Sequence, residues 1–219
     1  MRSKIFNNYS NIFWVFMVGS FLGFIHENLL TLLKGKYILR QGLIYEPLIP
    51  IYGLGAIVFY LIYKRINTKG KNLLINILKV FIIGFLVGGT VEYICSFMQE
   101  KIFGTISWDY SYLKYNLNGR TSLLHATFWG ILGEFFYWGL FPLVQKLSQL
   151  QKLKYGYIVT IVFSFILLFD STISFLACCR ATEREYKQDP SNSFETFLDK
   201  HYPNEYLDKI YNNAKTVKK

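Results

Sequence analysis

Five long apolar segments constrain this chain more than any other feature of its sequence. They cover about residues 12–33, 43–63, 73–98, 123–144 and 155–178. A helix needs about 20 consecutive, mainly apolar residues to cross the hydrocarbon core of a bilayer. With 52% hydrophobic and only 17% charged residues, the chain is too apolar for an ordinary soluble domain of its size. The sequence therefore predicts an all-α, polytopic integral membrane helical bundle of about five transmembrane helices.

A polar tail follows the predicted membrane domain. We place the domain at residues 1–179 and the tail at residues 180–219. The prolines of Asp189-Pro190 and Tyr202-Pro203 interrupt the tail, because the residue before a proline is disfavoured in a helix. Short amphipathic patterns beside these prolines predict one or two small helices. We expect a docked tail, whose apolar residues could pack on the outer face of the membrane domain or rest on the membrane interface.

Basic residues gather in alternate loops. The N-terminus and the loops after the second and fourth segments carry lysine and arginine without acids, whereas the other loops mix both signs. The positive-inside rule makes the basic side cytoplasmic. We therefore expect a multi-pass protein of the cell membrane with a cytoplasmic N-terminus and an extracytoplasmic tail. Orientation and membrane lipids as partners account for the net charge of +10, and no nucleic-acid partner is expected. The basic residues are Arg2, Lys4, Lys64, Arg65, Lys69, Lys71, Lys146, Lys152 and Lys154.

One pattern recurs in three of the apolar segments. The stretches GSFLGFIHE, GFLVGGTVE and ATFWGILGE each place two small residues and then a glutamate at steps of four, ending at Glu27, Glu92 and Glu134. Positions four apart lie on one face of a helix. Small residues in membrane helices let a second helix approach closely. Each glutamate is therefore expected on a helix–helix interface and not on the lipid face.

Carboxylates within membrane spans indicate a functional cavity. An ionised side chain at the bilayer centre costs about 2.5–3.5 kcal/mol, so such groups usually face partners or water. Glu27, Glu92, Glu134 and Asp170 lie within the predicted spans. We expect them to converge on an outward-facing polar cavity.

Arginines and loop residues at the outer level complete this hypothesis. An arginine there can neutralise the acids or bind a phosphate or carboxylate of a substrate. The loop WDYSYLKYNLNGR adds acceptors, amides and aromatic rings. The candidate cavity residues are His26, Glu27, Arg40, Glu92, Trp108, Asp109, Asn116, Arg120, His125, Glu134, Asp170 and Arg180.

The stretch GLIYEPLIPIYGLGA predicts an irregular start of the second segment. Its prolines and glycines, Pro47, Pro50, Gly53 and Gly55, favour a broken or re-entrant entry. Non-helical backbone at membrane depth is tolerated only where it is buried in protein or lines a cavity. We expect this stretch to meet that condition.

Motifs for metals, cofactors and nucleotide hydrolysis are absent from the sequence. There is no H-E-x-x-H pattern, and Cys95, Cys178 and Cys179 lack zinc-site spacing. No metal or cofactor is therefore expected. Nothing matches G-x-x-x-x-G-K-[ST], which excludes ATP hydrolysis by a P-loop in this chain. Whether the chain is an enzyme stays open, and Glu27 or Glu92 is the candidate general base.

Several stretches together resemble a known family. LRQGLIYEPLIPIYGLGA, TVEYICSFMQEKIFG, and WDYSYLKYNLNGR followed by FWGILGE are similar to the bacterial membrane proteins grouped as putative ABC-transporter type IV, also called CmpB-like permeases. The resemblance implies a permease that works with an ABC system. Glu46 departs from the pattern, which has glycine at this place, and leaves the shape of the loop entry open.

Three functions follow from these observations. The leading hypothesis is a permease or transport component, which needs a separate ATPase or another membrane subunit because this chain has no energy-coupling motif. The second is an intramembrane enzyme acting on a lipid-linked or envelope substrate, with Arg40 or Arg120 holding a phosphate. The third is a non-catalytic membrane protein of assembly or regulation.

Overall fold

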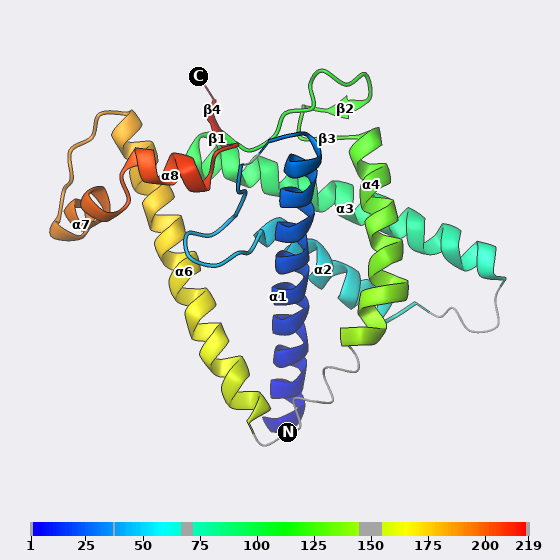
Figure 1. The fold of residues 1–219 in the computed structure, drawn as a ribbon. Helices are drawn as coiled ribbons and strands as arrows, with labels where there is room; N and C mark the ends of the chain where they lie inside the picture. The colour runs from blue at the N-terminus through cyan, green and yellow to red at the C-terminus, as the bar shows by residue number, and fades with distance from the viewer. Residues whose placement is uncertain (1, 37, 67–71, 145–154, 218–219) are drawn as a thin grey trace.

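The computed structural model describes residues 2–36, 38–66, 72–144 and 155–217. Figure 1 shows the start of the chain at one end of the molecule and the tail at the other. The helices are α1 (Arg2–Leu33), α2 (Pro50–Tyr63), α3 (Leu73–Phe103), α4 (Leu123–Phe135), the π-helical turn η1 (Phe136–Leu140), α6 (Gly156–Glu185), α7 (Ser193–His201) and α8 (Asn204–Ile210).

Three of these helices are long and apolar enough to cross a membrane, namely α1 from Asn8, α3 and α6. The prediction of about five spans is therefore not confirmed. α2 has 14 residues, and at 1.5 Å per residue it measures about 21 Å, short of the roughly 30 Å of a bilayer core. The regular part of α4 ends at Phe135. Pro142 lies just beyond η1, and because it has no N–H to donate to the preceding turn, it favours the widened backbone there.

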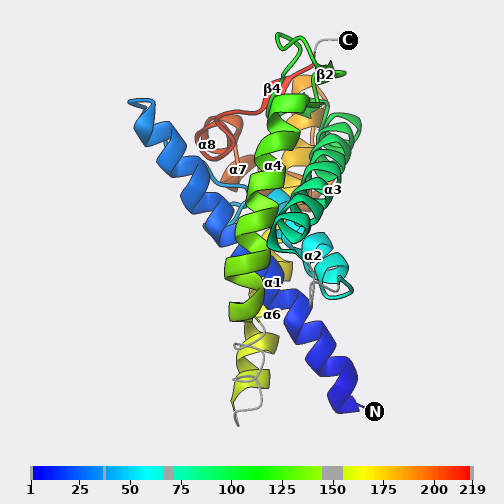
Figure 2. The ribbon, with the colours of Figure 1, turned by 90° about the vertical axis from the view of Figure 1, so that its right-hand side faces the viewer.

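Small residues bring the helices into close contact, as the repeated pattern predicts. A Cβ atom added to Gly84 of α3 would lie 3.1 Å from Cα of Gly130 in α4, and one added to Gly133 would lie 2.9 Å from Cα of Gly84. Gly23 of α1 leaves room in the same way for the Tyr52 side chain of α2. Figure 2 shows α3 next to α4, and α1 packs against α2. The prediction of helix–helix interfaces at these positions is confirmed.

The connection between α1 and α2 returns along α1 instead of leaving the bundle. Residues 38–49 are not helical, and the N–H of Ile49 donates to the carbonyl of Ser20, in the middle of α1, at 3.1 Å. We call residues 38–49 the descending segment. It lies between α1 and α6 (Figure 1). The second predicted segment therefore becomes helical at Pro50 and not at residue 43, because its first residues belong to this non-helical stretch.

The tail folds onto the C-terminal half of α6. Side chains of α7 and α8, with Tyr202 between them, pack on Ile173 and Ala177 of α6 and on Ile44 of the descending segment. Strand β4 (Lys215–Thr216) pairs with β1 (Thr105–Ile106), which follows α3. A second antiparallel pair, β2 (Asn116–Leu117) and β3 (Thr121–Ser122), shapes the connection between α3 and α4. The structure thus places the tail against the membrane helices and both predicted tail helices within it.

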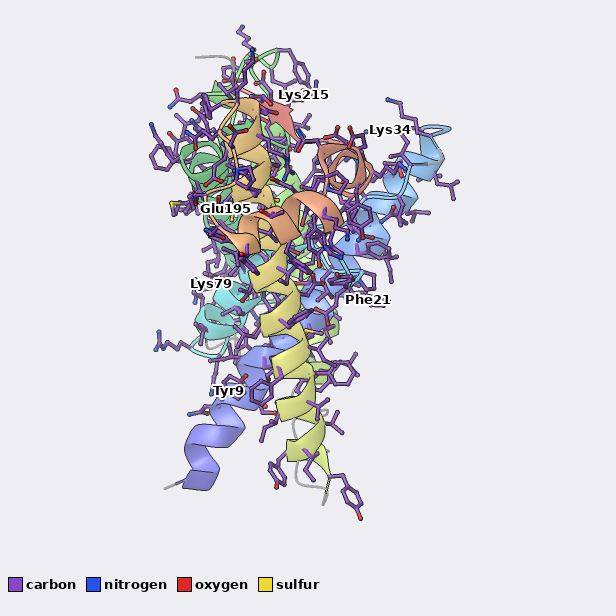
Figure 3. The ribbon with its side chains drawn as sticks, turned by 90° about the vertical axis from the view of Figure 1, so that its left-hand side faces the viewer. Tyr9, Phe21, Lys34, Lys79, Glu195 and Lys215 are labelled. Carbon is purple, nitrogen blue, oxygen red and sulfur yellow. The ribbon has the colours of Figure 1, made fainter. Side chains whose placement is uncertain are left out.

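Residues labelled in Figure 3 locate the two ends of the molecule. Lys34 and Lys215 lie toward the end that carries the tail, and Tyr9 lies toward the opposite end (Figure 3). At that opposite end, Thr160 of α6 accepts a hydrogen bond from the Trp14 indole at 3.0 Å and meets the Ser10 hydroxyl at 3.1 Å. Lys69, Lys71 and the basic residues at 146–154 lie outside the described residues, as do the side chains of Arg2 and Lys4.

Candidate functional site

Glu27 of α1 is held by one cation and one hydroxyl. Its Oε2 accepts a hydrogen bond from Nη1 of Arg40 at 2.8 Å, and its Oε1 accepts one from the Tyr52 hydroxyl at 2.6 Å. Asn28 fixes Arg40 through two hydrogen bonds with its backbone, both 2.8 Å long. The His26 ring meets the edge of Tyr52 with centroids 5.9 Å apart. This arrangement joins α1, the descending segment and α2 around a half-buried ion pair.

Glu92 of α3 is held without a cation. Its carboxylate accepts hydrogen bonds from the Tyr110 hydroxyl at 3.1 Å and from the Thr121 hydroxyl at 2.7 Å. The Trp129 indole also hydrogen-bonds to it. Glu92 is 6% exposed. In the part of the chain that the structure describes, no arginine, lysine or histidine forms an ion pair with it.

Aromatic rings connect these two carboxylates. The Tyr52 ring, bound to Glu27, lies 5.5 Å from the Trp129 ring, which is bound to Glu92. The negative charges of Glu92 and Glu27 both raise the pKa of the Tyr110 hydroxyl. The charge of Glu27 also repels that of Glu92. We call the group formed by Glu27, Arg40, Tyr52, Glu92, Tyr110, Thr121 and Trp129 the two-glutamate cluster. It draws together residues of α1, α2, α3, α4 and their connections.

Tyr110 brings the loop between α3 and α4 into the two-glutamate cluster. Its ring stacks on that of His125 with centroids 3.5 Å apart and an angle of 13° between the planes. Nδ1 of His125 in turn meets the Ser122 hydroxyl at 2.8 Å. Burial, and next the Glu92 carboxylate, raise the pKa of Tyr110 above its usual value. The phenol therefore remains a hydrogen-bond donor at physiological pH.

Asp170 of α6 has a different set of partners. Its carboxylate accepts hydrogen bonds from the backbone N–H groups of Ile44, Tyr45 and Glu46 at 3.1, 3.0 and 2.8 Å, and from the Ser174 hydroxyl at 3.0 Å. It is 1% exposed. Three successive N–H groups in a non-helical stretch form a concave binding site for an anion. Asp170 thus fixes the descending segment at the depth of the helices, which gives that irregular backbone its required partners.

Glu134 and two of the three predicted arginines also lie apart from the two-glutamate cluster. Glu134 accepts a hydrogen bond from the indole of Trp138, four residues on, at 2.6 Å. Arg120 pairs with Glu100 of α3 and its guanidinium lies 5.4 Å from the Phe97 ring centroid. Arg180 is 2% exposed and serves the tail instead of the acids of the spans. The sequence predicts that these arginines neutralise the acids of the spans or bind an anionic group of a substrate, and Arg40 pairs with one of those acids, Glu27.

Arg180 is the centre of the contact between α6 and the tail. Its Nε and Nη2 donate to the two carboxylate oxygens of Asp199, each at 2.9 Å, and its Nη1 donates to Glu183 at 3.0 Å. Arg184 adds a 2.6 Å ion pair with Asp199. Hydrogen bonds and charge from both arginines lower the pKa of Asp199 below its usual value. These groups hold α7 against α6.

Trp108, Asp109 and Asn116 stabilise the loop in which they lie. The Trp108 indole donates to the carbonyl of Arg120 at 2.8 Å. Asp109 accepts from the backbone and side chain of Ser111, at 2.8 and 2.9 Å, and these bonds lower its pKa. Asn116 bonds to the Leu113 carbonyl and to the N–H of Gly119. A hollow of about 50 Å³ beside Trp108, Asp109 and Arg120 does not reach the two-glutamate cluster.

Sequence reasoning missed several members of the two-glutamate cluster. Tyr52, Thr121 and Trp129 carry hydroxyl or indole donors whose role becomes evident only when α2, α3 and α4 are packed together. Tyr110 stands in the loop that was singled out, but its phenol had no assigned partner. No group of three histidine, cysteine, aspartate or glutamate side chains among the described residues is arranged to hold a metal ion.

Comparison with known proteins adds one match. A family model described as putative ABC-transporter type IV matches residues 14–175. This range covers most of the helices that carry the two-glutamate cluster, and it ends just beyond Asp170. No curated protein and no solved structure matches the chain.

Proposed function

The chain belongs to the putative ABC-transporter type IV family, and from this premise we propose that it is the membrane-embedded permease component of a transport system, with the two-glutamate cluster as its polar working site. The observation that carries this proposal is that Glu27 and Glu92, on separate helices, are bound by aromatic residues whose rings contact each other, Tyr52 and Trp129. Ionisable groups at membrane depth commonly mark substrate or ion pathways.

The orientation belongs to the same proposal. We infer a multi-pass protein of the cell membrane with the start of α1 cytoplasmic and the tail outside. Lys64 and Arg65, which follow α2, support this inference under the positive-inside rule. The positions of the N-terminus and the tail at opposite ends of the molecule are compatible with it (Figure 1). Membrane lipids would then cover the apolar outer faces of α1, α3 and α6.

The energy source would be a partner. Because the sequence contains no P-loop, ATP-driven transport requires a separate ATPase or another membrane subunit. The two-glutamate cluster would line the polar path, which we propose opens toward the outside. In this path, Arg40 would neutralise the charge of Glu27. The carboxylate of Glu92 would be bound by neutral donors, since it has no cation as partner among the described residues.

A strain that lacks the chain tests the proposal. Uptake of candidate solutes and the profile of membrane lipids are measured in the deletion strain, and then after expression of the unchanged chain, Glu27→Gln, Glu92→Gln or Glu205→Gln. Glu205 is an exposed tail residue and provides the matched control. We expect a solute flux that the unchanged chain and Glu205→Gln restore and that the two cluster variants do not restore at equal protein abundance.

Other outcomes contradict the proposal. Unchanged solute fluxes with altered lipid head groups or cell-wall precursors would instead support the intramembrane enzyme. Loss of abundance in both cluster variants, with normal flux per molecule, would indicate that the carboxylates only stabilise the fold. Solute movement in liposomes that requires neither nucleotide nor an ion gradient would exclude an active permease.

A further inference from the structure

Glu92 and Glu27 belong to one cluster but differ in what balances their charge. Arg40 neutralises Glu27 at 2.8 Å. Glu92 has hydroxyl and indole donors, which are neutral, and it is almost fully buried. Hydrogen bonds lower the cost of burying a carboxylate, but they do not remove its charge. A cation that binds here must therefore fit beside donors that already occupy both oxygens.

We propose that Glu92 is a proton-binding site and that one proton is its ligand. A proton needs no cavity, and it converts the carboxylate into a neutral acid that suits the interior of a membrane protein. Proton binding would supply the ion coupling of a transport component. That purpose rests on the proposed function, whereas the binding itself can be tested without it.

Among the residues that the structure describes, no positively charged group forms an ion pair with Glu92. The Arg120 side chain, from the turn between β2 and β3, contacts α3 beyond Glu92, at Ser96 and Glu100. The charge of Glu27 opposes a second negative charge nearby, although Arg40 offsets part of it. The titratable groups that face Glu92 or its donors from the surrounding elements are Glu27 in α1, Tyr52 in α2, Cys95 in α3, Tyr110 in the loop and His125 in α4.

Tyr110 provides a route for the proton. Its hydroxyl donates to Oε1 of Glu92 at 3.1 Å, and the residue is half-buried in the loop that follows α3. In the exchange, the Tyr110 O–H proton moves to Oε1, and the phenol oxygen takes a proton from solvent. One proton is thereby transferred and Tyr110 is restored. Because its raised pKa keeps Tyr110 protonated, the phenol transmits the proton and does not hold a negative charge.

Protonation would also change the contact between α3 and the loop. An ionised Glu92 accepts from Tyr110 on one oxygen and from Thr121 on the other. A protonated carboxyl has an O–H donor on one oxygen and keeps a full acceptor on the other. One of the two bonds to the loop is therefore weakened when the proton binds. The site would link proton uptake to the position of residues 104–122.

Difference infrared spectroscopy on the purified full chain in detergent tests the proposal. We expect the C=O stretching band of a protonated carboxyl to disappear as the pH is raised from about 4 to about 9, a range that begins near the ordinary value for glutamate. The band should be missing in Glu92→Gln and retained in Glu27→Gln. A band that is unchanged in Glu92→Gln, or no such band in the unchanged chain, would overturn the proposal.

A second variant protects the test against misfolding of Glu92→Gln. Thr121→Val removes the hydrogen bond to Oε2 of Glu92, the oxygen that stays a carbonyl when the proton binds Oε1, and leaves the acid in place. The band should then move to higher frequency, because a carbonyl that accepts fewer hydrogen bonds vibrates faster. An unmoved band would assign it to another carboxyl and overturn the proposal. Neither measurement requires transport, so a failure of the transport assays leaves the infrared result readable by itself.

Discussion

Asp170 and Glu92 are both buried carboxylates, 1% and 6% exposed, and both lie in long membrane helices. Asp170 binds three consecutive backbone N–H groups and the Ser174 hydroxyl. Glu92 binds the side chains of Tyr110, Thr121 and Trp129. Backbone donors cannot turn away without unfolding the segment that carries them, whereas a hydroxyl can rotate to another acceptor.

The number of hydrogen bonds therefore does not reveal the role of a buried acid. The origin of the donors does. Asp170 determines the path of the descending segment and is therefore part of the fold. Glu92 can change its protonation or its partners without removing the support of any backbone, which suits a working site. Four predictions test this contrast, and those with the greatest loss of stability come first.

Asp170→Ala should be the most damaging substitution. It leaves the N–H groups of Tyr45 and Glu46 without their acceptor, and the N–H of Ile44 keeps only the Ser174 hydroxyl. At about 1–3 kcal/mol for each unpaired group, we expect the free energy of unfolding in detergent to fall by at least about 2 kcal/mol, measured by denaturant titration. Glu92→Ala is the matched variant and should lose clearly less. Equal losses in the free energy of unfolding would contradict the different roles that we assign to Asp170 and Glu92.

Arg180→Ala should release the tail that covers the Asp170 region. It removes two 2.9 Å bonds to Asp199, of which the Asp199 side is 27% exposed and partly screened by solvent. We expect a loss of about 1–3 kcal/mol and faster proteolysis between residues 186 and 217. Lys200→Ala, an exposed change on α7, is the control. A tail that stays resistant in Arg180→Ala would mean that the apolar contacts of α8 suffice.

Acidification should loosen the same contact without any substitution. The folded pKa of Asp199 is lowered by Arg180 and Arg184, so its stabilising effect is complete above the unfolded value of about 4 and disappears as the pH falls through the folded value. Hydrogen exchange of α7 and α8 amides, corrected for intrinsic rates, should accelerate below about pH 4. Asp199→Asn should exchange faster at neutral pH and respond less to acid. Identical pH responses in the two chains would refute this account.

The finest comparison removes, for each acid, one neighbouring hydroxyl that donates a hydrogen bond to it. Ser174→Ala takes one donor from Asp170 and one acceptor from the N–H of Ile44, and should cost about 1 kcal/mol. Thr121→Val takes one donor from Glu92, and Tyr110 and Trp129 should compensate in part, so we expect about half that loss. Thermal unfolding of the two variants in the same detergent measures the difference. A larger loss in Thr121→Val would show that Glu92 is the more rigid site.

The sequence was a good guide to the helices that depend on local pattern. α1, α3 and α6 cover the first, third and fifth apolar segments, although α1 begins earlier and α3 ends later than expected. The start of α2 could not be located in this way, because residues 43–49 are apolar enough for a span. Their path depends on Asp170, more than 120 residues away, and no window of local sequence contains that partner.

The site was predictable in its acids and not in its pairings. Glu27 and Glu92 were identified because charge within a span is costly, and Arg40 was identified as a cation at the right level. Asp170 satisfied the same criterion but belongs to the fold. Arg120 forms an ion pair with Glu100, and Arg180 forms one with Asp199, because a guanidinium pairs with whichever carboxylate the packing brings within reach. That choice depends on tertiary structure.

The descending segment also constrains the order in which parts of the protein can fold. Its N–H groups are synthesised 124–126 residues before the Asp170 carboxylate that accepts their hydrogen bonds. At about 5–20 residues per second, a ribosome needs roughly 6–25 s to make that length of chain. During this interval the segment cannot settle fully beside α1 in lipid, because the N–H groups that Asp170 binds have no carboxylate acceptor there. It must wait in water or in a protein channel until α6 arrives, so the last long helix completes the placement of the first loop.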